Sequence, residues 1–203
     1  MAFDINNFKA QGLTRGGARP SLFQVEMSLP AELAALNSAL PKFTFTCRAS
    51  SVPAATVAPI EVPYFGRKIK LAGDRTFADW SVTVMNDEDF TVRRMFEEWS
   101  SLMNHNEFNL KYTDGNNYKL ADAVVTQFSK QGGPAIAAYT FVGMFPLEVS
   151  AMDLDWDATN TVQTFNVTFA YDYWVAGAQL GTTGFRVGGA AGAGTGGGFI
   201  PQV

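Results

Sequence analysis

Three aspartates in the stretch DLDWDATNTVQT are the clearest candidates for metal chemistry in this chain. Asp153, Asp155 and Asp157 have the spacing of the first carboxylate ligands of a calcium loop, where oxygen ligands suit a hard cation. The pattern then fails, because Ala158 stands where the loop needs a glycine and Thr164 where it needs a bidentate glutamate. We therefore expect a solvated acidic turn before a strand, and no metal site.

The residues that could carry catalysis are scattered along the chain. His105 is the only histidine and lies in the polar run MNHNEFN, without the serine elbow or Cys/His cluster that a triad or metal site requires. Cys47 is the only cysteine, and its alternation with phenylalanines favours a small core residue over a nucleophile. Asp74, Arg75 and Asp79 could be catalytic, but such groups more often form ion-pair or turn networks. The sequence predicts no catalytic residues and no cofactor, and an enzyme is the least favoured class.

The glycine-rich end of the chain contains the spacing of a dinucleotide-binding turn. Gly192, Gly194 and Gly197 match it, but no strand precedes them and no helix follows, so a nucleotide site is not expected. More than half of the 19 glycines follow Trp174, and glycine loses the most backbone entropy on ordering. We expect residues 175–203 to form an extension that is flexible unless a partner orders it.

Composition limits the remaining possibilities. A chain of 203 residues that is 47% hydrophobic and 17% charged suits one globular domain that needs no disulfide or metal to fold. The net charge of −4 argues against a dedicated nucleic-acid binder. The N-terminus lacks the pattern of a secretory signal, and no apolar run approaches the ~20 residues of a membrane helix. Residues 1–19 are interpreted as a polar arm, and residues 20–174 as the folded body.

The body is mostly strand-patterned, with one strong helix. Alternating residues predict strands at each of these sets: Phe23, Val25 and Met27; Phe43, Phe45 and Cys47; Trp80, Val82 and Val84; and Phe165, Val167, Phe169, Tyr171 and Tyr173, the last within one long strand over 161–174. Residues 118–128 and 137–145 are two further candidates, and residues 30–41 form a helix-capable insert.

The helix is expected over residues 87–104. Its apolar stripe of helical period comprises Val92, Met95, Phe96, Trp99, Leu102 and Met103. Asn86 or Asp87 could cap its free N–H groups, and acidic residues near its start suit the helix dipole. We expect this helix to cover the sheet, with Trp99 over the aromatic face of the 161–174 strand.

Residues 50–72 do not fit this pattern. Pro53, Pro59 and Pro63 interrupt them, and proline is confined to edges and turns of sheets. A long segment without clear structure is uncommon in a compact domain, so this one is either functional or ordered by another chain.

Several blocks, taken in order, carry a resemblance to a known family. They are ARPSLFQVEMS, FTFTCRASSVPAATV, FGRKIKLAGDRTFADWSVTVMNDED and MDLDWDATNTVQTFNVTFAYDYW, which together run from about residue 18 to 174. The sequence resembles the tail tube proteins of T4-like contractile-tailed bacteriophages. The insert at 30–41 and the glycine-rich end depart from the family pattern, which leaves the outer surface and the tail contacts open.

The resemblance implies a mainly β fold with one packed α-helix, an antiparallel β-sandwich or barrel of the tail tube type. It implies hexameric rings that stack into a hollow virion tube, each subunit giving strands to a continuous β-barrel around the lumen. The implied partners are further copies of the chain, the sheath, baseplate and tube-initiator proteins, the tape-measure protein and a tail terminator. DNA would pass through without specific binding, assembly would occur in the host cytoplasm, and no membrane insertion is implied. The same fold in a type VI secretion or related injection tube is the alternative, and a monomeric small-ligand barrel is a third possibility.

Within this expectation, residues 50–72 are the candidate contact between stacked rings, mobile in the free subunit and ordered on stacking. Ion pairs between subunits could join the basic residues of this arm to acidic residues elsewhere, although exposed pairs contribute only ~0–1 kcal/mol each. The predicted interface residues are Tyr64, Arg67, Lys68, Lys70, Asp74, Arg75, Asp79, Asp155 and Asp157. A neutral or acidic lining is expected for a channel that must not retain DNA, because cations dominate phosphate affinity.

Overall fold

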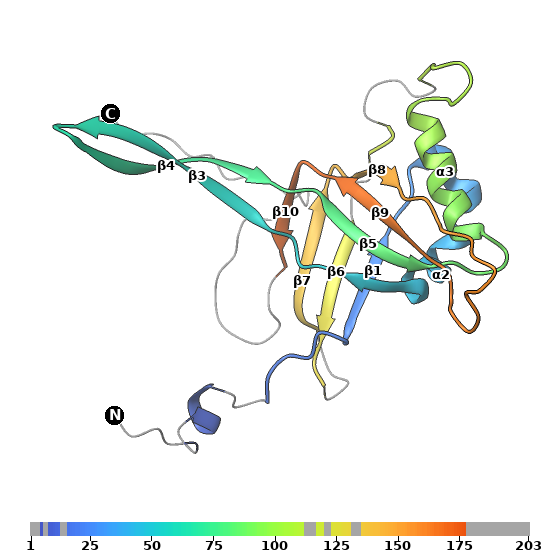
Figure 1. Ribbon diagram of the computed structural model, residues 1–203, viewed down its shortest axis with the longest axis horizontal. Helices are drawn as coiled ribbons and strands as arrows, with labels where there is room; N and C mark the ends of the chain where they lie inside the picture. The colour runs from blue at the N-terminus through green and yellow to red at the C-terminus, as the bar shows by residue number, and fades with distance from the viewer. Residues whose placement is uncertain are drawn as a thin grey trace, which may run out of the picture.

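The computed structural model describes residues 5, 8–12, 16–111, 117–119, 123–130 and 135–177. They form two four-stranded antiparallel sheets and a separate two-stranded hairpin (Figure 1). Sheet A has the order β1 (Phe23–Met27), β6 (Ala123–Phe128), β7 (Ala135–Val142), β10 (Tyr173–Ala176). Sheet B has the order β2 (Cys47–Ser50), β5 (Trp80–Met85), β9 (Thr164–Ala170), β8 (Phe145–Val149), and the hairpin joins β3 (Ala55–Tyr64) to β4 (Arg67–Phe77).

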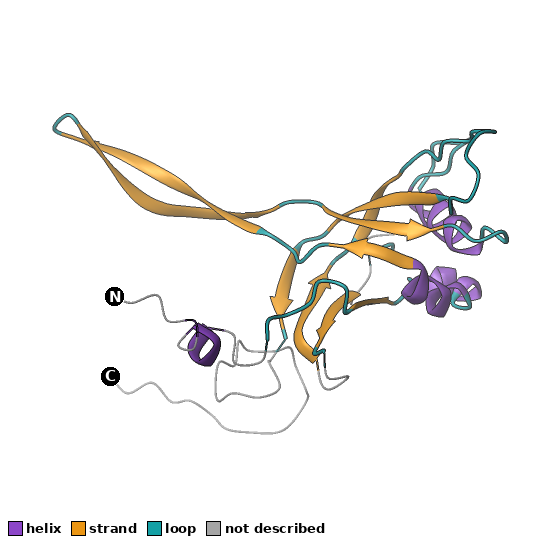
Figure 2. Ribbon diagram, turned by 60° about the horizontal axis from the view of Figure 1, so that its bottom comes forward, coloured by secondary structure: helices purple, strands orange, loops and turns teal. Residues whose placement is uncertain are grey.

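Helices gather at the end of the molecule opposite the hairpin (Figures 1 and 2). They are α2 (Ala39–Thr46) and α3 (Thr91–Met103), with a 3₁₀ helix at Ala31–Leu36 in the chain before α2; a π-helical turn lies at Phe8–Gly12 near the N-terminus. No helix within the described ranges is long and apolar enough to span a bilayer.

Aromatic rings fill the centre of the body. The Trp80 ring of β5 lies 4.5 Å from the Phe141 ring of β7, which joins the two sheets. The Phe96 ring of α3 contacts Phe43 of α2 at 5.6 Å and Phe169 of β9 at 5.8 Å. The two antiparallel sheets with their packed helices confirm the expected mainly β fold, and the aromatic contacts join the sheets and α3 into one core.

The strand expected over Phe43, Phe45 and Cys47 is wrong. Residues up to Thr46 belong to α2, and β2 begins only at Cys47. Phe43 is buried, whereas Phe45 is 84% exposed, so the two rings do not share a face as they would on a strand. The hydroxyl groups of Thr44 and Thr46 donate to carbonyl oxygens four residues earlier, which satisfies them within the helix.

The long strand expected over 161–174 is also divided. β9 ends at Ala170 in sheet B, and β10 begins at Tyr173 in sheet A. Between them the Asp172 N–H donates to the Val142 carbonyl at 3.0 Å, and Lys119 Nζ donates to both Asp172 carboxylate oxygens at 3.0 Å. The β9 half behaves as expected, because its Phe169 ring lies 6.4 Å from Trp99 of α3.

The helix expected over 87–104 begins at Thr91, and its start is held by Asp89 and not by either expected capping residue, Asn86 or Asp87. Asp89 Oδ1 accepts the Thr91 N–H at 3.1 Å, whereas Asn86 donates its side-chain amide to Gln163 instead. Phe90, the residue before the helix, has a φ of 53°. Lys42 of α2 forms ion pairs with both Asp87 and Asp89 and so connects the two helices.

This contact predicts a shifted titration. The hydrogen bond from Lys42, followed by that from the Thr91 N–H, lowers the pKa of Asp89 from 3.8 to about 2. The ionised Asp89 carboxylate therefore stabilises the folded state fully above its ordinary pKa. This contribution is lost as the pH falls through the lowered pKa of the folded state. Lys42→Met is expected to raise the pKa of Asp89 part of the way back, because the Thr91 bond remains. Carboxyl titration followed by NMR measures this, and an unchanged midpoint would contradict the contact.

Candidate functional site: the projecting hairpin, the open sheet edges and the acidic loop

The β3–β4 hairpin stands out from the body as a long twisted ribbon (Figures 1 and 2). Its ten-residue strand β3 spans on the order of 30 Å at about 3.3 Å per residue. Tyr64 pairs with Arg67 across the tip, and the turn residues Phe65 and Gly66 have φ angles of 42° and 80°. Two successive positive φ angles are the signature of a type I′ hairpin turn.

A bulge divides the hairpin into a base and a distal part. The register shifts between Val57 and Pro59, so that Ala58 faces both Gly73 and Asp74. A Cβ atom on Gly73 would lie 2.5 Å from the Ala58 carbonyl oxygen, which is why only glycine fits there. The base is tied to the body, since Trp174 Nε1 donates to the Ala54 carbonyl at 3.3 Å and Trp80 Nε1 to the Ser51 carbonyl at 2.8 Å.

The two faces of the distal hairpin differ in chemistry. The apolar face is formed by the register pairs Ile60 with Leu71, Val62 with Ile69, and Tyr64 with Arg67. These five apolar side chains are between 41% and 61% exposed, although aliphatic and aromatic groups usually gain by burial. The opposite face is charged, with Glu61 Oε2 accepting a hydrogen bond from Lys68 Nζ at 2.6 Å. An amphipathic ribbon of this kind has one face suited to another surface.

Residues 50–72 were expected to form an extended arm or hairpin, although the alternation in their first half is weak. They do form a hairpin, an antiparallel pair of Ala55–Tyr64 with Arg67–Phe77 that contains one bulge and continues five residues past the expected end. The prolines are compatible with this because each strand of a two-stranded ribbon has an open edge. The missed signal was the alternation of Ile60, Val62 and Tyr64 with its continuation in Ile69 and Leu71 after the turn.

The four edge strands of the two sheets differ in their suitability for further pairing. In sheet A, β1 and β10 pair without register shifts and contain no proline. In sheet B, the register shifts in both β2 and β8, and β8 contains Pro146. Bulges and prolines are the devices that prevent edge pairing, so sheet A has the edges that another chain could extend.

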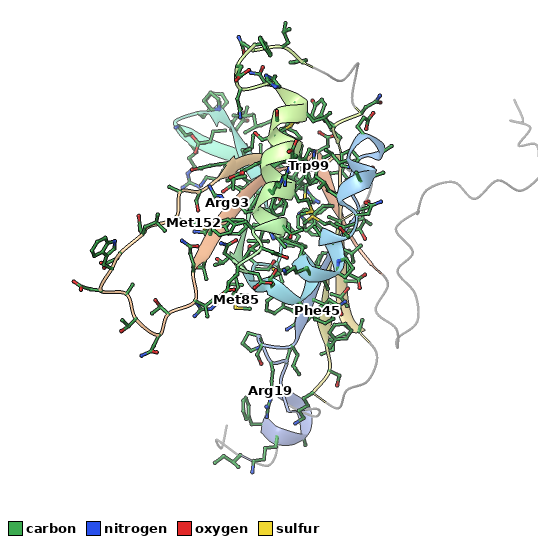
Figure 3. The ribbon with its side chains drawn as sticks, turned by 90° about the vertical axis from the view of Figure 1, so that its right-hand side faces the viewer. Arg19, Phe45, Met85, Arg93, Trp99 and Met152 are labelled. Atoms are coloured by element: carbon green, nitrogen blue, oxygen red, sulfur yellow. The ribbon has the colours of Figure 1, made fainter. Side chains whose placement is uncertain are left out.

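The acidic loop, residues 150–163, leaves the body beside α3. Arg93 Nη1 donates to the Ser150 carbonyl at 3.0 Å, and Figure 3 shows the chain projecting away from the body after Met152. The Asp157 N–H donates to Asp155 Oδ1 at 3.0 Å, which forms a tight turn around Trp156. The Trp156 side chain is 100% exposed and Leu154 87% exposed.

All nine predicted interface residues are exposed, and they fall into three places. Tyr64, Arg67, Lys68 and Lys70 lie on the distal hairpin, Asp74, Arg75 and Asp79 at or after its base, and Asp155 and Asp157 in the acidic loop. Within the described residues, no ion pair joins two of the nine; Lys68 forms its ion pair with Glu61 of its own hairpin. The structure thus brings together the first four and separates them from the acidic loop.

Cys47 and His105 were considered for catalysis in the sequence and were not expected to carry it. Cys47 is buried, and burial raises the pKa of its thiol to about 12, which makes it a poor nucleophile. The His105 ring stacks on Phe108 at 5.1 Å. No cluster of three or more acidic, histidine or cysteine side chains that could hold a metal occurs among them. The glycine pattern at 192–197 lies outside the described residues.

Comparisons with known proteins agree with this arrangement. A family model described as phage tail tube protein matches residues 18–177. Tail tube protein gp19 of Enterobacteria phage T4 is 40% identical over 157 residues, which cover 77% of this chain and 90% of that protein. The gp19 protein of Enterobacteria phage T6 is 41% identical with the same coverage.

Among solved structures, the sheath/tube terminator of an extracellular contractile injection system superposes with a TM-score of 0.57 at 14% identity, covering 80% of this chain and 97% of that one. A chain of the six-fold symmetrised anti-feeding prophage baseplate gives 0.54 at 15% identity, covering 79% and 95%. At these identities the superpositions bear on the fold alone.

Proposed function

The chain belongs to the phage tail tube protein family, and from this premise we propose that its copies close into six-membered rings which stack into the hollow tube of a contractile tail. It is a structural virion protein and not an enzyme, as its relatives at 40% identity are tail tube proteins of phages. Those relatives favour the phage version over a secretion tube. The expected boundary at Trp174 moves, because β10 continues to Ala176 and the Gly177 N–H donates to Ala138 O. The body at 20–177 would form the ring, with residues 1–19 and the residues after 177 as terminal extensions.

Ring closure is proposed to occur through sheet A. Leu22 O accepts the Phe128 N–H, and the Gly177 N–H donates to Ala138 O. The backbone groups of Leu22 and Gly177 therefore point to the neighbouring strands β6 and β7 and not to the open edges. Backbone groups alternate in direction along a strand. The backbone N–H and C=O groups that point to the open edges of sheet A are therefore those of Phe23, Val25 and Met27 on β1, and those of Trp174 and Ala176 on β10. Successive pairing is antiparallel, so β10 of one copy meets β1 of the next antiparallel and the barrel continues without a break.

The outer face of sheet A would then line the channel. It carries polar, small and aliphatic side chains with a single carboxylate and, among the described residues, no lysine or arginine: Gln24, Glu26, Val124, Thr126, Ile136, Ala138, Thr140, Val142, Tyr173 and Val175. Because phosphate affinity comes mainly from cations, DNA would pass such a lining without being held.

The hairpin is proposed to connect successive rings. It projects well beyond both sheets in Figure 1, so most of its length lies outside the subunit body, where it would meet another copy. The exposed apolar face of this hairpin is the observation that carries the proposal, because a projecting ribbon of this kind gains most when another copy covers it.

Other partners follow from the family and from the neighbours in fold. The sheath, a baseplate or tube-initiator protein and a terminator would meet the outside and the ends of the tube, as the names of the similar contractile structures indicate for those proteins. The tape-measure protein would occupy the lumen during assembly.

Negative-stain microscopy of the purified full chain tests the proposal. Hollow rings or tubes are expected as the protein is concentrated, because each copy offers both sheet edges and a hairpin to its neighbours. A chain that remains monomeric at every concentration, by microscopy and by light scattering, would contradict it.

A further inference from the structure

We infer that the apolar face and tip of the β3–β4 hairpin dock on the acidic loop of another copy of the chain, an interface that rests on the ring stacking proposed above. The occupant of the hairpin face is thus a second copy, and its receptor is the turn at 153–157. Three independent features support this pairing.

The first feature is the chemistry of the receptor. Trp156 is fully exposed and Leu154 nearly so, and the Asp155 to Ala158 turn holds them at the outer end of the loop. A buried tryptophan contributes a large contact area and is a frequent centre of interface energy. The loop therefore presents two exposed apolar side chains, Leu154 and Trp156, that the hairpin face could cover.

The second feature is complementary charge. Arg67 stands on the apolar face, paired across the tip with Tyr64, and Lys70 follows on the other face. The acidic loop carries Asp153, Asp155 and Asp157 around its two apolar side chains. The ion pairs of the described residues include none of these five charged groups. Docking would give Arg67 the carboxylates of Asp155 and Asp157 and the indole face of Trp156 as partners.

The third feature is position. The hairpin tip lies at one end of the molecule, and the acidic loop emerges at the other, beside α3 (Figures 1 and 3). One chain therefore cannot bring its own hairpin to its own loop. A contact between two different patches at opposite ends is head-to-tail and repeats from copy to copy, as the contacts within a ring and between stacked rings both do.

The tip conformation is consistent with a contact. Phe65 adopts a φ of 42° and is 91% exposed, and a bulky residue in the left-handed region is strained. Its ring packs edge-on against Tyr64 at 4.7 Å. The strained turn thus presents two aromatic rings beside Arg67 at the point farthest from the body.

Photo-crosslinking tests the contact directly. Trp156 is replaced by p-benzoylphenylalanine in the full chain, the protein is assembled and irradiated, and crosslinked peptides are identified by mass spectrometry. Crosslinks to residues 55–77 are expected. Tubes that crosslink only to other surfaces would overturn the inference while leaving ring stacking intact, whereas absence of tubes from the wild-type chain would instead count against the proposed function.

Charge exchange provides a second, independent measurement. Arg67→Glu alone, and Asp155→Arg with Asp157→Arg, are each expected to raise the protein concentration needed for tube formation at least about tenfold. Combining the three changes in one chain should recover most of the loss. The control Glu88→Arg with Glu107→Arg makes the same charge change elsewhere and should have little effect. If the combined variant needs a protein concentration raised by the product of the two separate increases, the charged residues do not contact one another and the inference is overturned.

Discussion

Replacing Val62 and Ile69 by aspartate is expected to abolish tube formation while leaving the folded body intact. The two side chains are cross-strand neighbours in the middle of the apolar face and are 41% and 50% exposed in the single chain. Burial of a complete aliphatic side chain contributes ~1.5–3 kcal/mol, and two carboxylates in their place would have to be desolvated without partners. A loss of at least ~3 kcal/mol per contact corresponds to a hundredfold or greater rise in the concentration needed to assemble.

The measurement is sedimentation of tubes across a concentration series, with negative-stain microscopy of each fraction. Glu61→Gln with Lys68→Gln is the matched control, because it changes the opposite face of the same strands and removes an exposed ion pair of small energy. Unchanged circular dichroism would show that the body of the aspartate variant is folded. Tubes at the wild-type concentration from that variant would exclude the hairpin from stacking.

Ala176→Pro is the second substitution with a large expected effect, this time on ring closure. The Gly177 N–H donates to Ala138 O at 2.7 Å, so the Ala176 N–H points away from β7 to the open edge of sheet A. Proline would remove that donor and place its ring in the path of a neighbouring strand without breaking a bond inside the chain. We expect a folded monomer that forms neither rings nor tubes.

Ala176→Val is the control for this substitution, because valine fills the same position with a β-branched side chain and retains the N–H. Size-exclusion chromatography with light scattering separates the two outcomes, and thermal unfolding reports on the monomer. If the proline variant forms closed rings as well as the valine variant does, β10 is not an interface between copies.

The sequence was most informative where period and burial agree. The stripe that includes Val92, Met95, Phe96 and Trp99 predicted α3 because all four face the core. The alternation of Trp80, Val82 and Val84 predicted β5 for the same reason. In such segments the local pattern and the tertiary environment favour the same structure.

The failures have physical causes in particular residues. Phe43 and Phe45 alternate as in a strand, but Phe43 also follows Ala39 by one helical turn, and burial of that pair favours α2. The aromatic alternation after Phe169 continues without a visible break into Tyr171 and Tyr173, although the chain changes sheets there. Asp172 makes this change possible through contacts with Val142 and Lys119, which are distant in sequence.

The assembly surfaces were only partly accessible from the sequence. The charged residues of the hairpin and the acidic loop were predicted as interface residues from the sequence. The apolar face of the hairpin was not predicted, because Pro59 and Pro63 interrupt the alternation that indicates a strand. The remaining part of the assembly surface was identified from solvent exposure in the structure, because a sequence does not show that Trp156 is fully exposed while Trp80 and Trp99 are buried.

A cryo-EM reconstruction of the assembled tube tests the central claim most directly, since it shows which strands join neighbouring copies. We predict that β10 of one copy pairs antiparallel with β1 of the next, with Thr126 and Thr140 facing the channel. A map in which sheet B lines the channel, or in which the edges of sheet A remain unpaired between copies, would contradict it.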